Sequence, residues 1–179
     1  MLDCIKHPLK FPSYDSVKGF EGQGNWAVNK YYFYPLRYFY RYKVRMIEKL
    51  LRGRKFSSIM DFGSGPGLLC KEWEKYSDYV CPIEKGDNFI PKVELAICAS
   101  VLEFVDLPST SKLLSEKCKE VIIASPMTSE FTQKYFSFIG DRNRRNSHDE
   151  IITSMSQYFN FTHLEYWKQI YFCARGFKR

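Results

Sequence analysis

The sequence lacks any apolar run near the roughly 18 residues that a membrane-spanning helix needs. It also lacks a Cys-x-x-Cys pair, because its six cysteines stand singly in apolar surroundings. We therefore expect reduced, buried thiols rather than disulfides or a metal site. The protein is expected to be cytoplasmic, neither exported nor membrane-spanning.

The sequence contains a glycine-rich stretch but neither of the common phosphate-binding signatures. Residues 59–69 read IMDFGSGPGLL, with glycines at positions 63, 65 and 67. A dinucleotide fingerprint would place its third glycine at position 68, which is Leu68, and a P-loop would end in Gly-Lys-Ser or Gly-Lys-Thr. The glycines therefore bring the backbone close to a ligand of another kind.

Composition indicates a folded chain with an excess of positive charge. Of 179 residues, 45% are hydrophobic and 17% aromatic, and the formal net charge is +7. The charge favours an anionic partner or good solubility, and some aromatic side chains are expected to line or cover a pocket. Residues 1–28, rich in Gly, Pro, Ser and Asp, are expected to form an irregular leader or lid. Residues 29–179 are expected to form a single domain.

Apolar periodicity predicts an α/β fold. Spacings of three and four residues predict a long amphipathic helix over 35–53. Strands are expected at 56–62, 79–83, 93–100 and 120–125, and helices at 68–76, 109–119 and 151–158. This alternation is typical of a doubly wound, mostly parallel sheet. Two further strand-like runs, 159–167 and 169–177, have one residue between them and predict an antiparallel hairpin.

The glycine stretch lies where such a sheet binds ligands, between the first strand and the following helix. Asp61 opens it, giving the motif Asp-x-Gly-x-Gly-x-Gly. Glu84 follows the second strand, 23 residues after Asp61. Nucleotide-binding folds place a ribose-binding acid at about this interval, and a carboxylate can accept hydrogen bonds from both ribose hydroxyls.

These features resemble the class I S-adenosylmethionine-dependent methyltransferases. The segment ICASVLEFV, residues 97–105, is similar to their fourth-strand segment of the form Val-Leu-Glu-His-Val, with Phe104 in place of histidine. The resemblance implies a Rossmann-like fold, S-adenosylmethionine as cofactor, and direct displacement of its methyl group by a small-molecule substrate. The cofactor-binding residues that it implies are Asp61, Gly63, Ser64, Gly65, Gly67, Glu84, Asp87 and Ser100.

The sequence departs from that family after the second strand. Only 8 residues, 85–92, separate Glu84 from the next strand, where the family normally fits a helix and a third strand. We therefore expect the third strand and its preceding helix to be shortened or missing. Asp87 either contacts the adenine of the cofactor or forms a Gly-Asp-Asn turn. Phe89 either covers the adenine or belongs to the core.

Motifs that the sequence lacks weaken the case for several classes of substrate. The chain has neither the Asp/Asn-Pro-Pro-aromatic motif of base-amine methyltransferases nor the Pro-Cys motif of cytosine C5 enzymes. Ribose 2′-O enzymes carry an Asp where Ser100 stands. Similarity to the small-molecule branch favours a metabolite. In that branch a His often faces the pocket, so His148 is the catalytic candidate, as a general base; its alternative is a structural place beside a helix cap at Ser147.

The predicted long helix carries a basic residue every four positions. Interleaved with tyrosines and phenylalanines, this ridge could bind nucleic acid or an anionic surface, or it could be a solvated face. Its members are Arg37, Arg41, Arg45 and Lys49. The alternative to an enzyme is therefore a catalytically silent or atypical methyltransferase-fold module that binds nucleic acid through this helix. The oligomeric state stays open.

Overall fold

The computed structural model describes residues 32, 36–65, 67–84, 87, 89–127, 146–168 and 170–179. The predicted leader 1–28 lies outside the described residues. The strands are β1 (Ile59–Phe62), β2 (Val80–Ile83), β3 (Val93–Ala99), β4 (Cys118–Pro126), β5 (Phe159–Trp167) and β6 (Tyr171–Lys178). The helices are α3 (Leu36–Leu51), α4 (Cys70–Trp73), the 3₁₀ helix η2 (Leu102–Phe104), α5 (Leu107–Lys117) and α7 (His148–Ser156).

One six-stranded sheet organises these elements, in the order β2-β1-β3-β4-β6-β5. The pairs β1–β2, β1–β3 and β3–β4 are parallel, whereas β6 runs antiparallel to both β4 and β5. This confirms the predicted Rossmann-like, mostly parallel sheet with an antiparallel C-terminal hairpin. The strand β2 is at the edge, and no strand is present among the described residues between β2 and β3, as expected from the short interval after Glu84.

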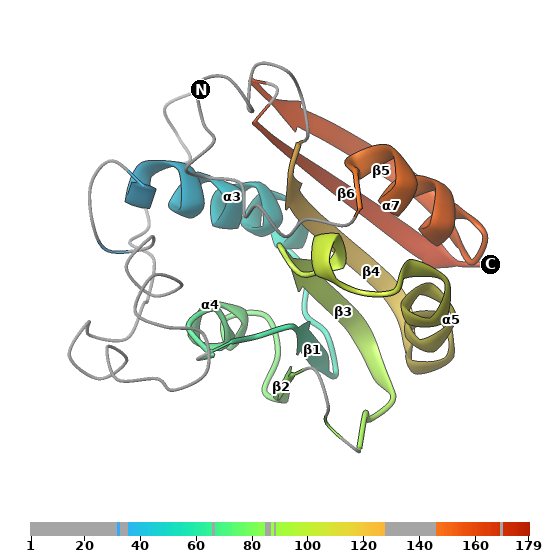
Figure 1. The fold of residues 1–179 in the computed structure, drawn as a ribbon. Helices are drawn as coiled ribbons and strands as arrows, with labels where there is room; N and C mark the ends of the chain where they lie inside the picture. The colour runs from blue at the N-terminus through green and yellow to red at the C-terminus, as the bar shows by residue number, and fades with distance from the viewer. Residues whose placement is uncertain are drawn as a thin grey trace.

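Helices cover both faces of the sheet, which creates two cores. In Figure 1, α3 and α4 lie to the left of the sheet and α5 and α7 to its right. On the first face Ile47 of α3 and Trp73 of α4 pack against the sheet. On the second, Leu114 of α5 and Met155 of α7 do the same. Both sheet faces are apolar because the strands alternate between the two cores, as in Met60 and Ile59 of β1.

Local hydrogen bonds explain where the helices begin. Helix α5 begins two residues before its predicted start because the Asp106 carboxylate accepts from Ser109 N–H. Helix α7 begins at His148, three residues early, because Ser147 and Glu150 form a reciprocal capping box. Helix α4 is shorter than predicted, with four residues, and its N-cap has no side-chain hydrogen bond. His148 therefore lies in the first helical turn rather than before the helix.

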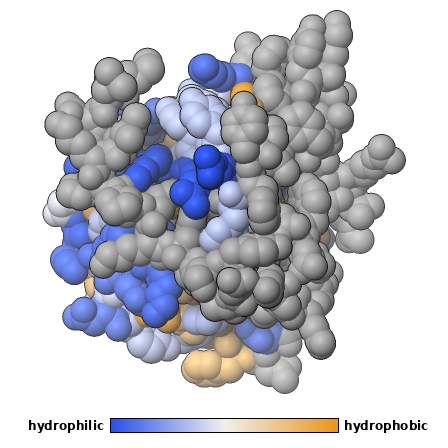
Figure 2. Space-filling view, turned by 90° about the vertical axis from the view of Figure 1, so that its left-hand side faces the viewer, coloured by the Kyte–Doolittle hydropathy of each residue, from blue (hydrophilic) through white to orange (hydrophobic). Residues whose placement is uncertain are grey.

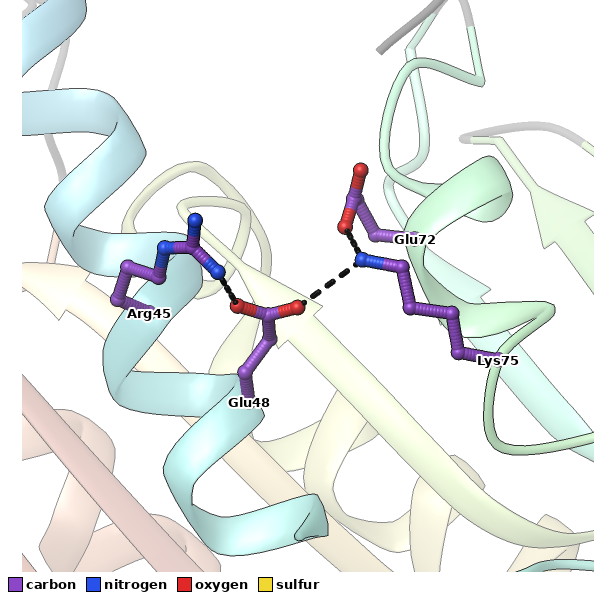
Figure 3. A network of polar contacts seen from close by, with 4 residues as sticks. All are labelled: Arg45, Glu48, Glu72 and Lys75. Atoms are coloured by element: carbon purple, nitrogen blue, oxygen red, sulfur yellow. Dashed lines mark hydrogen bonds and ion pairs between the residues drawn. The ribbon is translucent and has the colours of Figure 1, made fainter. Parts of the chain in front are cut away.

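A chain of ion pairs joins α3 to α4 (Figure 3). Glu48 accepts from Arg45 at 2.6 Å and from Lys75, just beyond α4, at 3.2 Å. Lys75 also pairs with Glu72, whose side chain is buried. Burial raises the pKa of the Glu72 carboxyl, while Lys75 opposes that rise. The network fixes α4, and hence the glycine stretch before it, relative to α3.

A second cluster of ion pairs involves Arg54, in the connection between α3 and β1. The Glu120 carboxylate, buried at the start of β4, accepts from both terminal nitrogens of Arg54 at 2.7 and 3.0 Å. It also accepts from Arg175 Nε on β6 at 2.5 Å. Burial raises the pKa of Glu120, and Arg54 opposes it. These bonds tie the α3–β1 connection to two central strands.

Two expectations from composition concern cysteines and membrane spans. The five cysteines in the described part are free, and Cys98, Cys118 and Cys173 are buried. None of the described helices has the length and apolar character required to span a bilayer.

Candidate active site

The glycine stretch forms a tight turn at the carboxyl ends of β1 and β2. Gly63, Gly65 and Gly67 all have positive φ angles, of 74°, 55° and 70°. The turn is fixed to β2 because Gly63 N–H donates to Ile83 O at 2.7 Å. A Cβ on Gly63 would lie 2.3 Å from Cγ2 of Val101, so that position admits only glycine for steric reasons as well.

Glu84 lies directly against this turn. Its Oε1 accepts from Gly65 N–H and, at 3.2 Å, from the Ser64 hydroxyl. The structure thus brings together three residues that the sequence assigns to one cofactor site. Within the described part of the chain, Oε2 of Glu84 has no hydrogen-bond partner, so it can accept from a ligand.

Asp87 and Phe89 follow Glu84 at the edge of the sheet. The Asp87 carboxylate accepts from the backbone N–H of Glu84 at 2.7 Å, which is the turn-forming arrangement. A contact between Asp87 and adenine stays a prediction. Phe89 is 76% exposed and does not belong to the core. The exposure of Phe89 excludes the interpretation as a core residue, and its ring is available to a ligand.

Asp61 is buried in β1 beneath the turn, on the face covered by α3 and α4. Burial raises its pKa to about 7, while the Cys70 thiol, which donates to Oδ2 at 3.5 Å, and the positive charge of Lys43 oppose the rise. The Asp61 side chain therefore changes charge near neutral pH. A cationic ligand group next to it would favour the ionised form.

Ser100 follows β3 and adopts an unusual backbone conformation. Its φ of 61° is positive although it is not glycine. Its N–H donates to Ala124 O at 2.8 Å, and its hydroxyl accepts from Lys43 Nζ at 2.7 Å. Sequence reasoning missed Lys43. The signal was available, since position 43 falls on the apolar stripe of the long helix, between Tyr40 and Ile47.

His148 occupies a separate place on the other face of the sheet. Its ring lies 5.9 Å from that of Phe172 and 6.3 Å from that of Tyr166, and Nε2 is 3.2 Å from the Asp149 carboxylate. Nδ1 is buried and has no hydrogen-bond partner among the described residues. In the described ranges, no hydrogen bond, ion pair or ring contact joins His148 to the glycine turn.

The segment η2 holds the start of α7, and hence His148. Asn146 donates its backbone N–H to Glu103 O at 3.2 Å and its side-chain amide to Leu102 O and Val105 O, each at 2.8 Å. The Glu103 carboxylate is buried and accepts from the Ser125 hydroxyl at 3.0 Å. Glu103 thus acts within the protein, and not at its surface.

The sheet order places the glycine turn at the position where open α/β sheets bind ligands. From β1 the chain passes to β2 on one side, and then returns to place β3 on the other. Ligands of open α/β sheets bind at such a switch point, at the carboxyl ends of the strands. Asp61, Gly63 and Ser100 all lie at the carboxyl ends of β1 and β3. In the described part of the chain, no group of three or more His, Cys, Asp or Glu could hold a metal ion.

Comparisons with known proteins identify the architecture. No protein-family model matches the sequence, and no curated protein matches it. Among solved structures, the N-methyltransferase NodS of Bradyrhizobium japonicum WM9, in complex with S-adenosylhomocysteine, superimposes with a TM-score of 0.62 at 10% identity, over 92% of this chain and 97% of NodS. The chain has a class I methyltransferase fold.

Two other methyltransferases have a similar fold. Magnesium protoporphyrin IX methyltransferase of Synechocystis PCC 6803, with bound S-adenosylhomocysteine, gives a TM-score of 0.57 at 12% identity, over 93% of each chain. An S-adenosylmethionine-dependent methyltransferase of Aquifex aeolicus gives 0.58 at 13% identity, over 75% of this chain and 88% of its own. In this methyltransferase fold, the present chain passes from β2 to β3 without a strand among the described residues between them.

Proposed function

We propose that the protein is an S-adenosylmethionine-dependent methyltransferase that acts on a small molecule. The observation that carries the proposal is the assembly of a glycine turn, Glu84, Asp61 and Ser100 at the switch point of the sheet. The relatives with the same fold that were solved with S-adenosylhomocysteine support this cofactor. When bound, S-adenosylmethionine supplies a methyl group already activated as a sulfonium.

Each residue of the turn has a role that follows from its place. The backbone of Gly63, Ser64, Gly65 and Gly67 would approach the methionine and ribose parts of the cofactor, since positive φ and absent side chains leave it accessible. Glu84 would accept hydrogen bonds from the ribose hydroxyls, mainly through Oε2, because Oε1 already accepts from Ser64 and Gly65. Asp61 and Ser100 would hold the amino end.

The adenine would lie toward the edge strand β2. Asp87 is the proposed partner of its amino group and Phe89 the proposed ring beside it, because both follow Glu84 and both are exposed. Stacking on an exposed aromatic ring is compatible with a nucleobase of any identity. The cofactor-binding set is therefore contributed by the ends of β1, β2 and β3.

Methyl transfer from a sulfonium needs alignment more than acid–base chemistry. Where the acceptor carries a proton, His148 is the proposed general base, with Nδ1 as the accepting atom because it has no partner in the described part of the chain. Asn146 and Glu103 would position it through the start of α7. We expect the acceptor to bind over the carboxyl end of β4, between the cofactor and α7.

The nucleic-acid alternative depends on the basic ridge of α3, and two of the positive charges of that ridge form ion pairs with carboxylates of the protein itself. Arg45 pairs with Glu48, and Lys49 pairs with Glu165 of β5 at 2.9 Å. Arg37 is exposed. The side of the molecule seen in Figure 2 is largely hydrophilic where described residues are drawn. These contacts favour a small-molecule acceptor over nucleic acid. The free cysteines are consistent with the proposed cytoplasmic setting.

Calorimetry with S-adenosylhomocysteine tests the proposal. The wild-type protein should bind it, and Glu84→Ala should bind about tenfold or more weakly, because a charge-assisted hydrogen bond contributes about 1.5–3 kcal/mol. Glu116→Ala is the matched control, since Glu116 is exposed on α5, which covers the other face of the sheet. Absence of wild-type binding, or equal affinity of the two variants, contradicts the proposed site.

The acceptor class can be tested separately. Anisotropy with labelled single-stranded RNA and DNA should show no binding at physiological ionic strength. Salt-dependent binding that Arg37→Ala weakens would instead support the nucleic-acid module.

A further inference from the structure

Lys43 is a buried lysine that the assignments above do not use. It lies on the sheet-facing side of α3, and its side chain is fully buried. Its Nζ donates to the Ser100 hydroxyl at 2.7 Å and lies 5.3 Å from the centroid of the Tyr40 ring. Burying an ammonium group is costly unless a partner compensates. The cost here is incurred at the switch point of the sheet, where the proposed cofactor site lies.

Asp61 is the carboxylate on which the Lys43 charge acts, and that charge lowers the Asp61 pKa against the effect of burial. Of the other titratable groups that face Asp61, Cys70 also lowers the Asp61 pKa, through the hydrogen bond that its thiol donates, but it carries no positive charge. Burial raises the pKa of Cys70 on α4 and of Cys98 on β3, so both are neutral thiols. Glu84, after β2, is an acid whose negative charge opposes the ionisation of Asp61.

We propose that Lys43 is a positioning residue of the cofactor site, which favours the ionised form of Asp61 for the ammonium group of the cofactor and holds Ser100 in its left-handed conformation. The inference rests on the proposed function and deepens it. Lys43 acts through Asp61 and Ser100, and it touches neither the methyl group nor the acceptor. Because Lys43 acts on the charge of Asp61, the affinity for the cofactor should depend on pH over the range in which Asp61 titrates.

The hydrogen bond to Ser100 has its own consequence. A left-handed residue other than glycine persists only where neighbours fix it. Here Ala124 O fixes the backbone N–H and Lys43 fixes the side chain. Together these bonds hold the end of β3 facing the glycine turn, so that the two walls of the site keep a constant separation before a ligand arrives.

An apolar residue could occupy the same volume without the cost of burying charge. Replacing a buried ionic group by a hydrophobic one of similar size is often neutral or stabilising. Lys43→Met is therefore expected to fold. A role in packing alone would leave the pH dependence of binding unchanged in this variant, whereas a role in ionising Asp61 would move it.

The experiment measures S-adenosylhomocysteine affinity as a function of pH for wild type, Lys43→Met and Lys49→Met. Lys49 lies on the same helix but is exposed and pairs with Glu165, so Lys49→Met controls for loss of one charge. A nearby opposite charge lowers a carboxyl pKa by roughly 1 to 3 units, so the binding midpoint of Lys43→Met should rise by about one pH unit. Affinity should then fall about tenfold near pH 6 and change less than about twofold near pH 8.5.

The outcomes separate this inference from the proposed function. If wild type does not bind, both fail. If wild type and Lys49→Met bind but Lys43→Met shows an unchanged midpoint, or an equal loss at every pH, the role of Lys43 is refuted and the cofactor site stands. A second measurement needs no variant: in the wild-type protein, the carbon-13 signals of the Asp61 carboxyl and the Lys43 ε-methylene should inflect at the same pH. Independent inflections would overturn the inference.

Discussion

Replacing Asp61 by asparagine should stabilise the protein in the absence of cofactor while weakening cofactor binding. The buried Asp61 carboxyl has a pKa of about 7, against 3.8 for an ordinary aspartate. Between these two values the folded protein holds a proton that the unfolded chain has released. The contribution of Asp61 to stability is therefore fully present below about pH 4, falls as the pH rises, and is lost above about pH 7.

The size of this effect follows from the two pKa values. A difference of about 3 pH units corresponds to about 4 kcal/mol, at about 1.4 kcal/mol for each unit. Asparagine has nearly the shape of the protonated side chain but does not titrate. Near pH 8 we therefore expect Asp61→Asn to exceed the wild type in free energy of unfolding by up to about 4 kcal/mol, and near pH 4 the difference should almost vanish.

Urea unfolding at the two pH values measures the difference, with Asp78→Asn as the control because Asp78 is exposed. The control should show no pH-dependent difference from wild type. S-adenosylhomocysteine should then raise the melting temperature of the wild type more than that of Asp61→Asn, since the proposed ammonium contact is lost. A wild type that is as stable as Asp61→Asn near pH 8 would refute the reasoning, since Asp61 would then ionise without cost.

Substitutions at four other positions test particular contacts. Gly63→Ala should lower the free energy of unfolding by about 3 kcal/mol, because the new Cβ meets Val101 and the φ angle is positive. Gly67→Ala should lower it by about 1 kcal/mol, because the space around Gly67 is open and only the positive φ angle is unfavourable. Equal losses in urea unfolding would contradict this reasoning. Glu120→Ala should cost about 3 kcal/mol by leaving two arginines without their buried partner, and an unchanged unfolding midpoint would show that the cluster contributes nothing. Ser147→Ala should cost about 1 kcal/mol through loss of the helix cap, and restored stability at that position with aspartate would identify capping as the cause.

Much of the fold could be predicted from the chain because its signals are local. The alternation of strand and helix patterns predicted a parallel sheet, and one residue between two strand-like runs predicted the hairpin of β5 and β6. The interval of 8 residues after Glu84 is too short for a helix and another strand, and none is described between β2 and β3. Helix starts were less accurate because they depend on individual capping bonds, as at Asp106 and Ser147.

The site was only partly predictable. The glycine turn and Glu84 were found because spacing along the chain and the periodicity of the strands place them at one edge of the sheet. Phe89 could not be assigned to core or surface, since an isolated aromatic residue in a short loop has no periodic context; the structure exposes it. For His148, the residue pattern predicted a neighbouring helix cap, whereas the contact with Phe172 and the buried Nδ1 depend on how α7 packs on the hairpin.

The sequence by itself determined the α/β architecture, the position of the glycine turn and the carboxylate that joins it, because each follows from periodicity and short-range spacing. Only the tertiary structure decided that Lys43 is buried against Ser100 and that Asp61 has a pKa near neutrality. Both depend on side chains that the tertiary packing brings together: α3, which precedes β1 in the chain, packs on β4 and β6 and places Lys43 on Ser100, while Cys70 of α4 lies on Asp61. Burial and charge coupling arise from such packing between distant segments, and no local pattern of residues specifies them.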